Sequence, residues 1–282
     1  MQLVRRWLWL AAALGGLVPS PATAEPTLVA AEHHPWGCFR PGAWRVTRMT
    51  TETLGENGEV ASTNATEIRT TLQSVGEREL TLQVEVTVEA AGRRIDGDPQ
   101  IVRQGFHGES PGSTPAVTAS EGEVLLEGQR IACHVLELAF DLPGARTVTK
   151  IHYAPETPPY VLRRESVITD NDDGAKLSET TMTVHATEMP FRVGAEIKPA
   201  SLSRLVQTHG KGTTTTWSFS SVEIPGGVIH HTSKDRNAEG RTVRRNVLEL
   251  VDFGYEPEPE SRPGGLLRRL RNSLWERPVN RF

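Results

Sequence analysis

One short string in this sequence matches a catalytic motif, the Gly-x-Ser-x-Gly of serine hydrolases. Gly108, Ser110 and Gly112 occupy its fixed positions. In that motif the serine lies on a sharp turn between a strand and a helix, which presents the hydroxyl to the substrate. Here Pro111 and Pro115 follow Ser110 in a loop-like stretch, and no helical pattern comes after them. The context favours a solvated loop serine, so serine hydrolysis is a minor alternative.

Nine histidines raise the question of a metal site. His33-His34 and His230-His231 are adjacent pairs, and neighbours on a strand point to opposite faces of the sheet. The sequence has no H-E-x-x-H string and no cysteine pair at zinc spacing. The acidic run Asp170–Gly174 has the composition of a calcium loop but not its ligand spacing. We therefore expect no catalytic residue, no metal and no cofactor.

The two cysteines are Cys38 and Cys133. In an oxidising compartment an even pair can form one disulfide, which would stabilise the fold by a few kcal/mol if unstrained. The alternative is two buried free thiols, because cysteine is often buried without a bond. The sequence leaves both possibilities open.

The stretch Thr147–Val184 predicts three antiparallel strands. Side chains alternate in type along Thr147–Tyr153, so one face can pack while the other stays wet. Three prolines in Ala154–Pro159 stop the hydrogen-bonded ladder, because proline has no backbone N–H. The chain resumes as a strand at Tyr160–Thr169, turns at the acidic run described above and returns as a third strand.

A second copy of this pattern follows at Thr214–Val251. The offset is 66 residues before the Pro-rich turn and 67 after it, which favours an internal duplication. A partial third copy is Trp44–Leu72. The alternative is that any antiparallel protein repeats its hairpins. If the duplication is real, the copies share the scaffold, and a function would lie between them.

Other segments complete a mainly β prediction. Glu79–Ala90 has the clearest alternation, with Leu and Val on one face, as in a strand with one buried face. A long hairpin is also predicted, with strands at Trp44–Leu54 and Val60–Val75. Pro199–Gly210 is the one predicted helix, because its apolar residues have helical spacing and its ends carry suitable capping residues.

The N-terminus has the pattern of a signal peptide over residues 1–24. Arg5-Arg6 precede the apolar run Trp7–Val18, and Ala22-Thr23-Ala24 forms an A-x-A site with cleavage expected after Ala24. Residues 25–40 read as a flexible leader. We expect a periplasmic or extracellular protein, with an uncleaved anchor as the alternative.

The C-terminal residues 254–282 read as a linker followed by a basic amphipathic tail. Such a helix can lie on an anionic membrane surface or contact an envelope protein. The alternatives are a frayed tail and a helix docked on the β region. The residues that carry this prediction are Leu266, Leu267, Leu270 and Leu274 on one face, Arg268, Arg269 and Arg271 elsewhere, and Trp275 beside the apolar stripe.

The formal net charge of −4 does not indicate a basic surface for nucleic acid, so no nucleic-acid partner is expected.

Between leader and tail, the chain divides into an N-terminal β region, 41–140, and the duplicated hairpin region, 141–253. The charged strand residues are interpreted as cross-strand ion pairs on a solvent-exposed face, with the lining of a polar groove as the alternative. They are Arg163, Arg164, Glu165, Arg244 and Arg245.

The runs KIHYAPETPPYVLRRES with DNDDG, and IPGGVIHHTSKDRNAEGR with LELVDFG, resemble a group of secreted β-rich proteins of planctomycete-type bacteria. That group carries no assigned function. More distantly, the order of strands and turns is similar to the half-barrel of periplasmic lipoprotein carriers, in which a curved sheet surrounds an apolar cavity. The resemblance implies antiparallel curved sheets or a half-barrel.

The sequence thus predicts an exported non-enzymatic β protein that binds or carries an apolar or envelope ligand, such as a lipid. The alternative is a structural or protein-interaction module of the envelope.

Overall fold

The computed structural model describes residues 29–77, 79–107 and 115–255. The predicted signal peptide, Ser110 and the tail residues Leu266–Trp275 lie outside the described residues.

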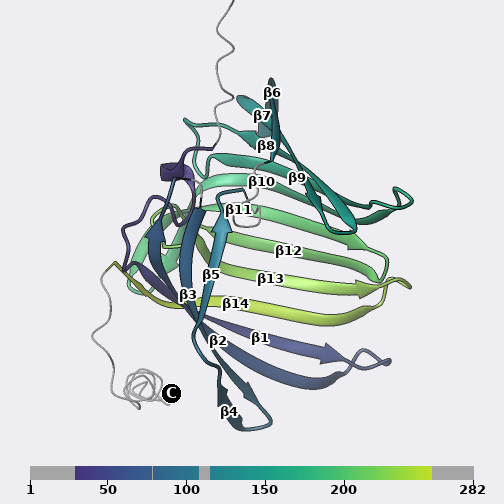
Figure 1. Ribbon diagram of the computed structural model, residues 1–282. Coiled ribbons are helices and arrows are strands. Elements are labelled where there is room, and N and C mark those ends of the chain that lie inside the picture. Colours follow the sequence, from purple (N-terminus) through teal and green to yellow (C-terminus); the bar gives the residue numbers. More distant parts are fainter. Residues whose placement is uncertain (1–28, 78, 108–114, 256–282) are drawn as a thin grey trace, which may run out of the picture.

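The described chain forms one open, curved antiparallel sheet of 14 strands (Figure 1). A short 3-10 helix, η1 (Ala31–His33), is the one helix among the described residues. No helix in the described part of the chain is long and apolar enough to span a membrane. The strands are β1 (Trp44–Leu54), β2 (Val60–Val75), β3 (Glu79–Ala90), β4 (Arg93–Asp96), β5 (Gln100–Gly105), β6 (Ala116–Leu126), β7 (Gln129–Leu142), β8 (Ala145–Tyr153), β9 (Val161–Asp170), β10 (Lys176–Val193), β11 (Glu196–His209), β12 (Gly212–Ser220), β13 (Val228–Asn237) and β14 (Thr242–Gly254).

The strand order places the first strand beside the last. The sheet runs β4-β3-β2-β1-β14-β13 and then in reverse chain order to β6, with β5 also paired to β3. Trp44 of β1 pairs with Gly254 of β14, so the two ends of the strand region meet inside the sheet. The edges are β6 at one side and β4 with β5 at the other (Figure 1).

The predicted mainly β, antiparallel and curved architecture is confirmed. Alternation explains the best-predicted strand, β3, in which Leu80 and Leu82 are buried. Leu82 pairs with Leu72 of β2, and both pack with Trp36 and Ala43 in one apolar cluster. Burial of such side chains stabilises each by about 1.5–3 kcal/mol relative to exposure.

The predicted helix Pro199–Gly210 is wrong, because Pro199–His209 belongs to β11 and Gly210 lies in the turn that follows. The strand pairs with β10 on one side and β12 on the other. Leu202 lies opposite Phe219, whereas Leu205 lies opposite Thr216, so the two leucines point to opposite faces. A strand with apolar residues on both faces can imitate helical spacing over one short window.

Two turns at the same end of the sheet have the same backbone hydrogen bonds. In the turn Ala154–Tyr160, bonds run from Ala154 N to Tyr160 O, Thr157 N to Ala154 O, Tyr160 N to Thr157 O and Val161 N to Pro159 O. The turn Ser221–Gly227 repeats all four at an offset of 67 residues. We call these the first and second turn. The duplication read from the sequence stays a prediction.

The N-terminal segment 29–43, most of it within the leader predicted to be flexible, packs against the sheet. Val29 is buried in a cluster with Leu136 and Ile151, at one end of the sheet. Trp36 is buried in the cluster with Leu72 of β2. The segment therefore bridges strands that lie far apart in the strand order.

Candidate functional site

The segment 29–43 is attached to both turns. The His33 ring stacks on Tyr160 of the first turn, with ring centroids 3.8 Å apart. His33 Nδ1 also lies within hydrogen-bond distance, 2.6 Å, of the Tyr153 hydroxyl. In the second turn, Gly226 donates its N–H to the Pro35 carbonyl at 2.8 Å. One short stretch thus connects two turns that are 67 residues apart in the sequence.

Arg45 of β1 strengthens the attachment to the second turn. Its Nη1 donates to the Gly226 carbonyl at 2.9 Å, and its guanidinium lies 5.3 Å from the centre of the Trp36 ring. Burial lowers the pKa of Arg45 to about 10, which still leaves it charged at neutral pH. No carboxylate of the described residues pairs with this guanidinium, so the turn carbonyl and the indole ring stabilise its charge.

His34 fixes the shape of the segment from inside. Its Nδ1 accepts hydrogen bonds from the backbone N–H groups of Trp36, at 3.1 Å, and Gly37, at 3.3 Å. Burial, with a smaller contribution from His107, lowers the pKa of His34 to about 4. The imidazole is therefore neutral at pH 7, as an accepting Nδ1 requires.

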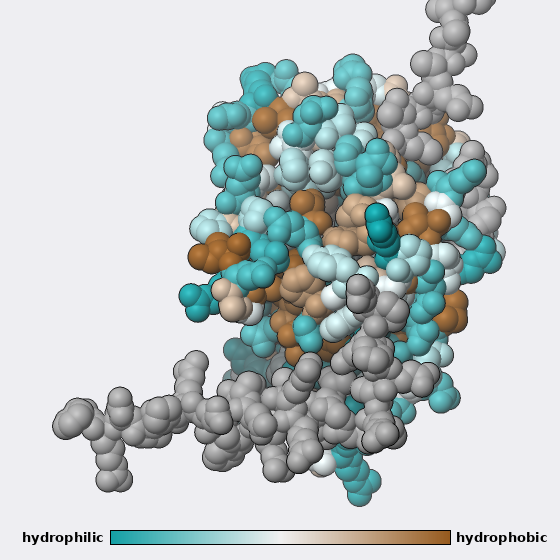
Figure 2. Space-filling view, turned by 90° about the vertical axis from the view of Figure 1, so that its left-hand side faces the viewer, coloured by the Kyte–Doolittle hydropathy of each residue, from teal (hydrophilic) through white to brown (hydrophobic). Residues whose placement is uncertain are grey.

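A cleft of about 170 Å³ lies between the two turns and the N-terminal segment. Its walls come from Pro35 and Cys38 of the segment, Pro159 and Tyr160 of the first turn, and Val222 and Gly227 of the second, among others. Figure 2 shows this end of the molecule, where apolar residues lie exposed among polar ones. Glu32, Ser220 and Ser221 also line the cleft, but most of its exposed lining surface is apolar, so it favours an apolar ligand over a charged one.

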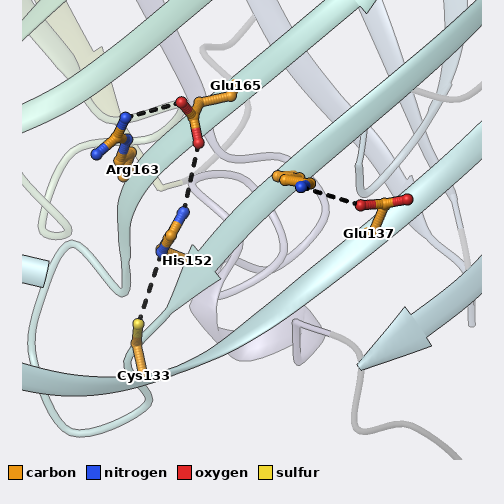
Figure 3. A network of polar contacts seen from close by, with 6 residues as sticks. Cys133, Glu137, His152, Arg163 and Glu165 are labelled. Atoms are coloured by element: carbon orange, nitrogen blue, oxygen red, sulfur yellow. Dashed lines mark hydrogen bonds and ion pairs between the residues drawn. The ribbon is translucent and has the colours of Figure 1, made fainter. Parts of the chain in front are cut away.

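A separate polar network lies on strands β7, β8 and β9 (Figure 3). Cys133 Sγ is 3.8 Å from His152 Nδ1, and His152 Nε2 is 3.6 Å from Glu165 Oε2. Glu165 also accepts a 2.8 Å hydrogen bond from Arg163. The order thiol, imidazole, carboxylate is the order of a cysteine-nucleophile triad.

The electrostatics of this network oppose a nucleophilic role. Burial raises the pKa of the Cys133 thiol, and the nearby Glu121 and Glu123 raise it further. Burial also lowers the pKa of His152, although Glu165 acts in the opposite direction. Burial raises the pKa of Glu165, but Arg163 and His152 outweigh it and leave that pKa lowered. A neutral thiol beside a neutral imidazole is a poor nucleophile.

The disulfide that the sequence left open is not formed. Cys38 and Cys133 are both free, and Cys38 is exposed rather than buried. Cys133 occupies the network on β7, whereas Cys38 lines the cleft.

Other sequence candidates lie in ordinary structural roles. Asp170 and Asp173 accept backbone hydrogen bonds within the acidic turn. Arg245 pairs with Glu52 on the neighbouring strand at 2.8 Å, as the cross-strand interpretation predicts. Arg163 instead pairs with Glu165 along its own strand. No group of three His, Cys, Asp or Glu residues suited to a metal ion occurs among the described residues.

The sequence pointed to the space between the copies but missed the N-terminal side of the cleft. His33 and Pro35 come from the leader, where no periodic pattern indicates packing. The one available signal was the apolar pair Trp36 and Phe39 in an otherwise polar stretch.

No protein family and no curated protein matches this chain. Two solved structures match this chain with low TM-scores. One is a "putative lipoprotein" from Parabacteroides distasonis, with 8% identity and a TM-score of 0.32, covering 78% of this chain and 98% of that one. The other is a "putative exported protein with YmcC-like fold" from Bacteroides fragilis, with 8% identity and a TM-score of 0.30, covering 77% and 97%. At this similarity no function is carried over from either protein.

Proposed function

We propose that this chain is an exported, non-enzymatic binding protein that holds a small apolar group in the cleft between the two turns. The observation that carries the proposal is the mainly apolar lining of a cleft of about 170 Å³. An apolar cavity of about 150 Å³ is enough to bind a benzene-sized ligand. An aromatic ring or a short stretch of an acyl chain is therefore the class of ligand that fits.

Several features support a preformed site. His33 stacks on one turn, Pro35 bonds to the other, and neutral His34 holds the segment between them. A site whose walls are already held in place loses little entropy when a ligand binds. The raised pKa of the Cys133 thiol supports a non-enzymatic function, because the thiolate is the nucleophilic form.

The test is binding of N-phenyl-1-naphthylamine, an apolar dye that fluoresces on leaving water. Val222 lines the cleft and is 38% exposed, so Val222→Trp should fill the cleft without disturbing the core. We expect its dissociation constant for the dye to rise by about tenfold, equivalent to about 1.4 kcal/mol. The matched control is Val243→Trp, because Val243 on β14 is 37% exposed and is not among the residues that line the cleft.

Equal dye affinity of both variants and the wild type would refute the proposal, as would no saturable binding at all. Native mass spectrometry of the chain expressed with export supplies an independent readout. A co-purifying apolar molecule that is lost in Val222→Trp and retained in Val243→Trp supports the proposal.

One observation favours a protein-interaction module as the second candidate. Ile95 of β4 and Ile101 of β5 are each 61% exposed at one edge of the sheet. Exposed apolar residues on edge strands are suited to the addition of a partner strand. For this function, Ile101→Lys would abolish association while leaving dye binding unchanged.

A further inference from the structure

A row of five side chains crosses strands β9 to β13 on one face of the sheet. Register places Arg163 opposite Thr183, Thr183 opposite Arg204, Arg204 opposite Trp217, and Trp217 opposite Thr232. Directly opposed residues of neighbouring strands point to the same face. We call these five residues the Trp217 row.

Trp217 is the centre of this row. It is 40% exposed, whereas Trp36 and Trp44 are buried. The Arg204 guanidinium lies 5.7 Å from the centre of its ring, and the His185 ring lies 5.1 Å away. An exposed indole flanked by basic groups is an amphipathic surface, which can contact both an apolar face and an anion.

Arg163 pairs with Glu165, but two other cations at the row lack an ion pair in the described part of the chain. Neither Arg204 nor Lys234 forms an ion pair with any described residue. Lys234 lies opposite Thr215, two positions from Trp217, and so diagonal to the indole on the same face. By contrast, Lys150 and Arg245 on the same face pair with Glu137 and Glu52.

Arg163 adds an unsatisfied donor. Its Nη2 bonds to Glu165, but its Nε is buried and has no hydrogen-bond partner among the described residues. A buried donor without a partner costs about 1–3 kcal/mol. Because neighbouring strands lie about 4.8 Å apart, Arg163 and Arg204 are separated by about 10 Å, with the Thr183 hydroxyl between them.

We propose that the Trp217 row binds an acidic saccharide whose chain lies across the strands. The polarised C–H groups of a sugar ring are attracted to the negative face of the indole. Arginine binds a carboxylate in a planar, two-point geometry, so Arg204 and Arg163 are each suited to a carboxylate of the saccharide. The hydroxyls of Thr183 and Thr232 are suited to hydrogen bonds with sugar hydroxyls.

Single-stranded nucleic acid would use similar stacking and basic groups. The net charge of −4 disfavours it, because nucleic acid is attracted by an extended basic surface. It is therefore an outcome of the test and not the proposal.

The test is titration of the full chain with trigalacturonate in low salt, followed by calorimetry and by quenching of tryptophan fluorescence. We expect Arg204→Gln and Trp217→Leu each to raise the dissociation constant by about tenfold or more, and salt to weaken wild-type binding. Arg192→Gln is the matched control, because Arg192 is an exposed β10 arginine that also lacks an ion pair among the described residues. Its affinity should stay within about twofold of the wild type.

Four results would overturn the proposal. They are no binding of trigalacturonate by the wild type, equal binding of neutral maltotriose, equal affinity of all three variants, and tighter binding of oligothymidylate. The outcome is independent of the cleft, because Val222→Trp leaves every residue of the row in place.

Discussion

Tyr160 and Gly227 occupy the same position in two turns and have the same left-handed backbone, with φ angles of +71° and +79°. Each donates its N–H to the carbonyl three residues earlier and has its own carbonyl bonded to the first residue of the turn. Glycine adopts this conformation freely, but tyrosine adopts it at a cost of about 1–2 kcal/mol. Tyr160, the residue with the less favourable backbone conformation, is the one on which His33 stacks.

The second turn tests how tightly the N-terminal segment is packed. A Cβ at Gly226 would lie 2.7 Å from Trp36 and from Arg45 Nη1, at a φ of +72°. Gly226→Ala should therefore lower the free energy of unfolding by about 2–5 kcal/mol, from overpacking and backbone strain together. Gly128→Ala is the matched control, because Gly128 has a φ of +81° and open space around its Cβ. Its expected loss is about 1 kcal/mol, and equal losses would contradict close packing.

His34 predicts a loss of stability in mild acid. Its pKa is about 4 in the fold and about 6.5 when unfolded, so the unfolded chain takes up the proton first. The stabilisation is fully present above pH 6.5 and is lost as the pH falls from 6.5 towards 4. At pH 5 the loss should be about 2 kcal/mol, measured by urea unfolding at pH 8 and pH 5.

The variant His34→Asn keeps an acceptor for the Trp36 and Gly37 N–H groups but has no titrating ring. Its stability should fall by about 2 kcal/mol less than that of the wild type between the two pH values. His209→Asn is the control, because exposed His209 also accepts a backbone N–H, that of Lys211. A wild-type slope in His34→Asn would show that other groups cause the acid sensitivity.

Two neighbouring leucines of edge strand β6 predict how that edge is held. Leu126 is 5% exposed and packs in a cluster with Leu162 and Val184 of strands β9 and β10, whereas Leu125 is 67% exposed. Leu126→Ala should cost about 2–4 kcal/mol of unfolding free energy, and Leu125→Ala less than about 0.5. Thermal unfolding of both variants measures this, and similar losses would mean that the β6 hairpin is not docked.

The cysteines predict one reactive thiol in the native chain. Burial raises the pKa of both thiols, but Cys38 is exposed, whereas Cys133 is 3% exposed. Titration with 5,5′-dithiobis(2-nitrobenzoate) should therefore detect about one thiol when folded and about two in urea without reductant. In Cys38→Ser the folded chain should show none. A wild-type chain that shows no thiol until it is reduced would instead contain the disulfide.

Strands with one clear alternating face were predictable from the sequence alone. The predicted bounds of Trp44–Leu54, Val60–Val75 and Glu79–Ala90 are those of β1, β2 and β3. In these strands the turn residues and the alternation indicate the same structure. In β11 the apolar residues do not alternate, because Leu202 and Leu205 face opposite sides of the sheet. This segment is a strand because it pairs with β10 and β12.

The candidate site was less predictable, because it depends on contacts between distant segments. Tyr160 and Val222 lie in turns that the sequence marked, but His33 reaches Tyr160 only because the leader folds back onto the sheet. The Trp217 row depends likewise on five strands in one register. Neither turn chemistry nor alternation specifies register between strands.

The pairing of Trp44 with Gly254 has a consequence for folding order. During synthesis or export from the N-terminus, β1 emerges about two hundred residues before β14, the strand that joins it to the rest of the sheet. The N-terminal strands therefore cannot pair with the rest of the sheet until β14 is present. Such late long-range pairing slows folding. A circular permutant that joins Gly254 to the N-terminal segment and opens the chain between β5 and β6 would place β6 to β14 and then β1 to β4 in one continuous meander, with β5 paired to β3 outside it.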